Sequence, residues 1–83
     1  MELSFTKVGT TYIADYSASS HFNIHIEGGK RVALFNKTSG ENWAIVTEFK
    51  TPIVDYDVAV NIPKTYRIVC SKNPSLCVIT NVQ

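Results

Sequence analysis

The stretch HFNIHIEGGKRVALFN, residues 21–36, contains two runs of alternating apolar and polar residues joined by a Gly-Gly pair. In the first run, Phe22, Ile24 and Ile26 alternate with polar residues. Successive side chains of a β-strand point to opposite faces, so this alternation predicts strands that bury one face and leave the other open.

The same alternation continues along the rest of the chain, and no window of eleven or more residues carries a convincing helical stripe. Gly, Pro, Asn and Ser punctuate the runs at short intervals, which is typical of tight turns between strands. We therefore predict an all-β fold: a small two-layer antiparallel β-sandwich of about eight short strands, forming a single domain over residues 1–83. Jelly-roll and immunoglobulin-like wiring both remain open. The expected strands are residues 3–8, 11–16, 21–27, 30–36, 41–49, 53–61, 65–70 and 77–82.

Turn lengths suggest which strands pair, because a slip of one residue would turn apolar side chains to the wrong face. A two-residue turn at Gly9-Thr10 would pair the first two strands. A three-residue loop ending in a left-handed Gly29 would join the next two, and a four-residue loop over residues 37–40 would follow. These loops would place Ile24 opposite Val32, Val32 opposite Ile45 and Leu34 opposite Trp43. They predict a three-stranded meander whose apolar face consists of Phe22, Ile24, Ile26, Val32, Leu34, Trp43 and Ile45.

The last hairpin is predicted around a six-residue loop, residues 71–76, which would place Cys70 opposite Cys77. A cross-strand disulfide would be geometrically possible there. Two cysteines without a secretion signal are more often free, so we expect two packed thiols.

Composition excludes several classes of partner. The 83 residues suffice for one core. Eight Lys and Arg against seven Asp and Glu give a net charge of +1, too small to attract nucleic acid or an anionic membrane by charge alone. There is no apolar run long enough for a membrane span and no secretory signal, so we expect synthesis in the cytoplasm.

Two groups of residues could suggest chemistry. His21 and His25 share a strand face but would lie about 13 Å apart, too far to bind one metal ion. Asp55 and Asp57 share a face at about 7 Å, a spacing that could hold carboxylates for hydrolysis or calcium, yet no third acid accompanies them. We expect no catalytic, cofactor or metal site, and a protein that is not an enzyme.

The face opposite the predicted meander core suggests a protein interface. It would carry four apolar residues among polar ones, as the core and rim of an interface do. The candidate interface residues are Ala33, Phe35, Ala44 and Val46, with His21, Asn23, His25 and Arg31 around them.

Three segments, residues 12–16 (YIADY), 22–27 (FNIHIE) and 38–40 (TSG), carry a resemblance to a known group. The chain resembles small auxiliary or decoration capsid proteins of crAss-like and related tailed bacteriophages of gut Bacteroidetes. The resemblance implies a virion protein made in the host cytoplasm, a decoration protein or a base for head fibres, whose partners are further copies of itself or the major capsid protein. The rival hypothesis is a ligand-binding module, for instance for carbohydrate, that uses Trp43 or exposed tyrosines as stacking platforms.

Overall fold

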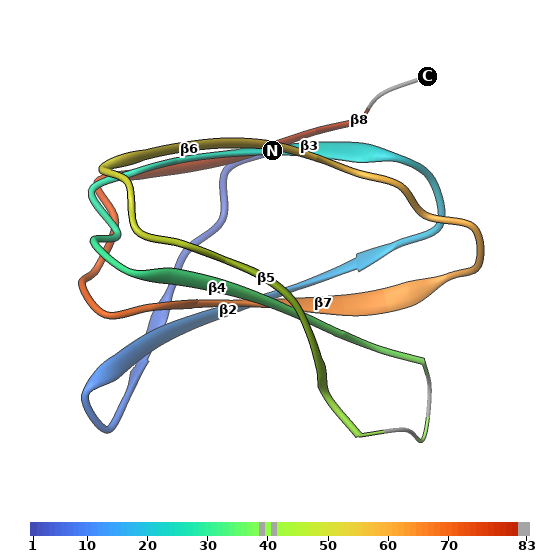
Figure 1. The fold of residues 1–83 in the computed structure, drawn as a ribbon, viewed down its shortest axis with the longest axis horizontal. Coiled ribbons are helices and arrows are strands. Elements are labelled where there is room, and N and C mark those ends of the chain that lie inside the picture. Colours follow the sequence, from blue (N-terminus) through green and yellow to red (C-terminus); the bar gives the residue numbers. More distant parts are fainter. Residues whose placement is uncertain (39, 41, 82–83) are drawn as a thin grey trace.

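The computed structural model describes residues 1–38, 40 and 42–81, and this part of the chain contains eight β-strands and no helix (Figure 1). The all-β prediction is therefore confirmed. The predicted strand ends at Glu41 and Val82 lie outside the described residues. The strands are β1 (Thr6–Val8), β2 (Thr11–Ala18), β3 (Phe22–Glu27), β4 (Val32–Lys37), β5 (Ala44–Phe49), β6 (Ile53–Val58), β7 (Lys64–Cys70) and β8 (Leu76–Asn81).

The strands form two antiparallel sheets packed face to face (Figure 1). Sheet B has the order β1-β2-β7-β4-β5 and sheet A the order β6-β3-β8. Residues 1–3 extend sheet A beyond β8, because Met1 exchanges backbone hydrogen bonds with Ile79 and the Leu3 N–H donates to the Cys77 carbonyl. The N-terminal segment thus pairs with β8 in sheet A. The chain then crosses to sheet B, where β1 pairs with β2.

The pairing is nested along the chain: the N-terminus with β8, β2 with β7, β3 with β6, and β4 with β5. A long antiparallel hairpin rolled into two sheets gives this arrangement, which is the wiring of a jelly roll. Of the two wirings that the sequence left open, the structure therefore has the jelly roll.

One core lies between the sheets. Its fully buried side chains include Phe22 and Ile26 from β3, Leu34 from β4 and Ile68 from β7. Phe22 makes edge-to-face contacts with Tyr16 and Tyr66, at centroid separations of 5.0 and 5.1 Å. The inward positions that alternation predicted on β3 and β4 are confirmed.

The predicted hairpin between β3 and β4 is wrong, because the two strands lie in different sheets. β3 pairs with β6 and β8, so Ile24 is opposite Tyr56 and Ile79 instead of Val32. Gly28 and Lys30 have positive φ values of 83° and 67°, whereas Gly29 does not. The connection is a corner from one sheet to the other, and a corner buries the same apolar faces as a hairpin would.

β4 and β5 do pair, but the predicted register is wrong. Val32 lies opposite Phe49 and Leu34 opposite Thr47, where Ile45 and Trp43 were predicted. A shift between Leu34 and Phe35 leaves Val46 without an opposite residue and places Ile45 opposite Phe35. Ile45 is consequently 55% exposed, outside the core.

The predicted β7–β8 hairpin is also wrong. β7 lies in sheet B and β8 in sheet A, so Cys70 and Cys77 are not cross-strand neighbours. Both cysteines are buried and free, as expected of packed thiols. The turn at Gly9-Thr10, by contrast, is confirmed by the pairing of Val8 with Thr11.

Candidate protein interface

The outer face of sheet B carries a continuous set of apolar side chains. On β2, β7 and β4 the side chains that point into the core alternate with side chains that point outward. The outward ones include Ile13 of β2, Val69 of β7, and Ala33 and Phe35 of β4. Ile13 and Ala33 both lie opposite Val69, and Phe35 lies opposite Ile45 of β5. We call these five residues, Ile13, Ala33, Phe35, Ile45 and Val69, the apolar face.

Polar side chains border the apolar face. Arg67 of β7, opposite Phe35, donates from Nε and Nη2 to the two carboxylate oxygens of Asp15 at 2.8 and 3.0 Å. The Arg67 guanidinium and the Lys37 ammonium lie 4.4 and 4.6 Å from the centroid of the Trp43 ring. Trp43 is therefore half-buried beneath two cations, where the sequence had placed it in the core.

The structure divides the predicted interface residues between two faces. Ala33 and Phe35 belong to the apolar face, and Ala44 and Val46 are exposed on β5 at the edge of the same sheet. Sequence reasoning missed Ile13 and Val69 of this face. Their positions between the inward residues of β2 and β7 could have indicated them.

The histidines lie elsewhere. His25 lies on β3 of sheet A and His21 directly precedes that strand, whereas Phe35 lies on β4 of sheet B. The prediction that the two histidines border Phe35 is therefore wrong. His21 Nδ1 accepts a hydrogen bond from the Val60 N–H at 2.8 Å. Arg31 lies in the β3–β4 connection, near Ala33 but beyond the end of the strand.

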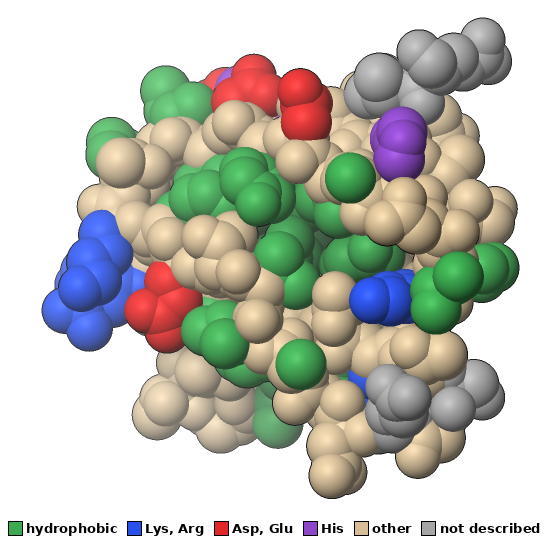
Figure 2. Space-filling model, turned by 45° about the vertical axis from the view of Figure 1, so that its right-hand side comes forward, with side chains coloured by type: hydrophobic (Ala, Val, Ile, Leu, Met, Phe, Trp, Pro, Cys, Tyr) green, Lys and Arg blue, Asp and Glu red, His purple; other side chains and the backbone are tan. Residues whose placement is uncertain are grey.

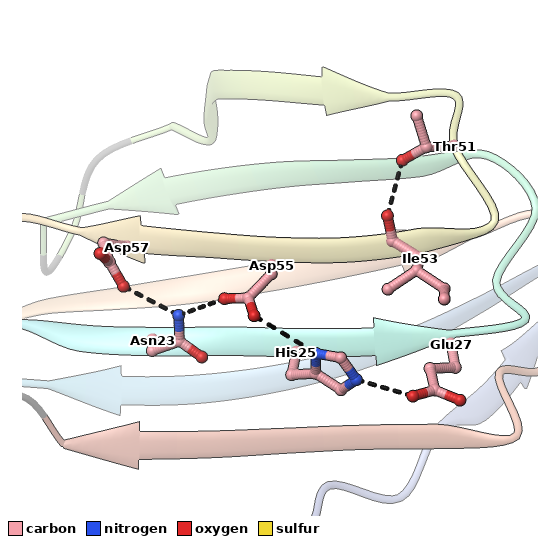
Figure 3. A network of polar contacts seen from close by, with 7 residues as sticks. All are labelled: Asn23, His25, Glu27, Thr51, Ile53, Asp55 and Asp57. Carbon is pink, nitrogen blue, oxygen red and sulfur yellow. Dashed lines mark hydrogen bonds and ion pairs between the residues drawn. The ribbon is translucent and has the colours of Figure 1, made fainter.

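A polar network covers the outer face of sheet A (Figure 3). The Asn23 amide donates to Asp55 at 2.6 Å and to Asp57 at 2.8 Å. His25 Nε2 lies 2.8 Å from a Glu27 oxygen, and its Nδ1 lies 3.6 Å from Asp55. The hydrogen bond with Glu27, and less so the contact with Asp55, raises the pKa of His25.

These side chains satisfy one another, within β3 between His25 and Glu27 and across to β6 through Asp55 and Asp57. Asp55 and Asp57 share one amide donor, and no set of three or more His, Cys, Asp or Glu residues placed to hold a metal ion occurs in the described part of the chain. Burial raises the pKa of Cys70 to about 12 and that of Cys77 to about 11, which keeps both thiols protonated.

Both sheets end in an open strand on the same side of the molecule, β5 in sheet B and β6 in sheet A (Figure 1). Three large exposed apolar residues lie on these two strands: Ile45 and Val46 on β5, and Ile53 on β6. β6 also carries Asp55 and Asp57, charges that discourage pairing with another edge, whereas Glu48 is the one charged residue of β5. β5 is therefore the edge better suited to contact another chain.

No protein-family model, curated protein or solved structure matches this chain. Among the described residues, no helix is long and apolar enough to cross a membrane.

Proposed function

We propose that this chain is a non-enzymatic structural protein that assembles through the apolar face and the adjoining edge of β5. The observation that carries the proposal is the pairing of the partly exposed Phe35 with Ile45, which is 55% exposed, on the outer face of sheet B. Apolar residues grouped on an outer face beside polar ones are typical of interfaces.

The particular role that we propose is an auxiliary protein of a phage capsid, as a decoration protein or a head-fibre base. The resemblance of residues 12–16, 22–27 and 38–40 supports it. Jelly-roll wiring, which recurs in viral capsid domains, is compatible with that role, although a fold by itself does not define a function. The partner would be further copies of the chain, the major capsid protein, or both, in a virion assembled in the host cytoplasm.

The absence of enzymatic activity is part of this proposal. Asp55 and Asp57 are held by the Asn23 amide, and the two thiols are buried with raised pKa values. Groups engaged or protonated in this way are poor acids, bases and nucleophiles.

The solution mass tests self-assembly directly. Light scattering at low and high protein concentration should show a discrete oligomer, and Phe35→Lys with Val46→Lys should convert it to a folded monomer. Ser19→Lys with Thr80→Lys is the matched control, because it adds the same two charges at exposed residues on the β2–β3 connection and on β8, away from β5. A monomeric wild-type chain at every concentration, or an oligomer unaffected by the double substitution, would refute self-assembly through this face.

A further inference from the structure

Four connections lie together at one end of the sandwich, on the left in Figure 1. They join β1 to β2, β3 to β4, β5 to β6 and β7 to β8. Consecutive strands run in opposite directions, so alternate connections return to the same end of the molecule. Residues far apart in sequence therefore become neighbours at this end.

Backbone hydrogen bonds hold these connections together. The Gly28 N–H donates to the Pro52 carbonyl, and the Ser71 N–H donates to the Arg31 carbonyl, at 3.2 and 3.0 Å. In return the Arg31 N–H donates to the Ser71 hydroxyl at 3.1 Å. Lys30, which lies between Gly28 and Arg31 in the sequence, has a φ of 67°. Non-glycine residues rarely adopt this left-handed conformation, and it often marks a functional segment. The end is thus a preorganised platform.

The platform is basic. Lys30, Arg31, Lys50 and Lys72 are all exposed there, half of the eight Lys and Arg of the chain, and we call them the basic end. Within residues 1–38, 40 and 42–81, none of the four forms an ion pair. Figure 2 shows Lys and Arg side chains gathered at the left of the molecule, with an acidic side chain beside them.

A hollow of about 250 Å³ opens where the basic end meets the apolar face. Ala33 and Val69 line it together with Arg31, Lys50 and Glu48. The hollow is smaller than the roughly 300–1,000 Å³ of most small-molecule sites. An apolar side chain would fit it, with an anionic group beside it on Arg31 and Lys50.

We propose that this hollow binds an acidic segment of a partner protein, with an apolar side chain between Ala33 and Val69 and neighbouring carboxylates on Arg31 and Lys50. The inference rests on the proposed function, because it names the chemistry of the partner that docks on the outer face of sheet B. The unpaired cations supply the charge complementarity. Glu48 of the outermost strand β5 and Lys50, directly after that strand, lie along the hollow.

Glu48 favours a peptide over a nucleic acid. Its carboxylate lines the same hollow as the two cations and would repel a closely spaced row of phosphates, whereas a peptide with alternating acidic and apolar residues can place its carboxylates away from Glu48. The net charge of +1 also gives little general attraction for a polyanion.

The probe is an acetylated and amidated hexapeptide of alternating glutamate and leucine, added to the isotopically labelled full chain and followed by NMR. We expect the amide signals of Arg31, Ala33, Lys50 and Val69 to shift and the apparent affinity to fall with salt. The glutamine–leucine analogue and the double substitution R31Q/K50Q should each bind about tenfold more weakly, since two exposed charge pairs are lost. E48Q should bind more tightly.

The matched control is K37Q/K64Q, which removes the same charge from the other end of the sandwich and should leave binding unchanged. Peptide shifts elsewhere, equal binding by R31Q/K50Q, or tighter binding of a thymidine oligonucleotide at the same residues would overturn the proposal. Loss of self-association in F35K/V46K tests the proposed function separately. A wild-type chain that is monomeric at every concentration but still binds the peptide at Arg31 would refute self-assembly and retain this site. A wild-type oligomer that shows no peptide shifts would do the reverse.

Discussion

Arg67 holds Asp15 by two hydrogen bonds, at 2.8 and 3.0 Å, and at the same time stacks on Trp43 with its guanidinium carbon 4.4 Å from the ring centroid. The Asp15–Arg67 pair joins β2 to β7, and Trp43 belongs to the β4–β5 connection. One guanidinium therefore connects three segments at the border of the apolar face. Its planar geometry suits both contacts, which a lysine would not reproduce.

Replacing Asp15 with Asn should lower the free energy of unfolding by about 1 kcal/mol or less at pH 7, the usual size of a partly exposed ion pair. The Arg67 hydrogen bond lowers the pKa of Asp15. The stability that the pair contributes is therefore fully present above the pKa of Asp15 in the unfolded chain, about 3.9, and is lost as the pH falls through the lower pKa of the folded chain. Urea unfolding at several pH values should show wild type and variant converging in acid. A constant difference at all pH values would contradict the ion pair as its source.

His25 should titrate above its ordinary value of about 6.5, because Glu27 and Asp55 stabilise the imidazolium. Its contribution to stability is then full below about pH 6.5 and is lost as the pH rises through the higher folded pKa. NMR titration should show that Glu27→Gln lowers the pKa of His25 more than Asp55→Asn does, since the Glu27 contact is the shorter, 2.8 against 3.6 Å. An equal or reversed order would show that the assignment of the main partner is wrong.

The two cysteines should be unreactive in the native chain. Burial raises the pKa of Cys70 to about 12, so Cys70 carries very little thiolate at pH 8, and burial blocks access to it as well. A colorimetric thiol reagent at pH 8 should label neither cysteine until urea is added, after which both should react. Ser19→Cys, on an exposed connection, serves as the positive control. Rapid labelling of the folded wild type would contradict the packed-thiol arrangement.

Gly29 should not tolerate a side chain, although its φ is not in the left-handed region. A Cβ atom there would lie 2.9 Å from Val32 Cγ2, closer than real Cβ contacts, and 3.0 Å from Cys70 Sγ, which is also unusually tight. We expect Gly29→Ala to cost about 1–3 kcal/mol in unfolding free energy, the range for overpacking. In a Val32→Ala background the same substitution should cost less, because one clash is gone. An unchanged cost there would argue against a steric cause.

The sequence by itself determined the class of fold and, over much of the chain, which side chains point inward. Alternation on β3 and β4 identified Phe22, Ile24, Ile26, Val32 and Leu34 as core residues, and all five are buried. The signal is strong because each strand must bury one face, and the period of two is a property of the extended backbone.

Only the tertiary structure decided which strands pair. A hairpin and a crossing between sheets bury the same apolar faces, and hydrophobic burial has no direction that would choose between them. For that reason Cys70 and Cys77 were assigned to one hairpin but lie in different sheets, and His25 was grouped with Phe35 although the sandwich separates them. The basic end likewise exists only in the folded chain, because the jelly-roll wiring brings Arg31 and Lys50 to one hollow.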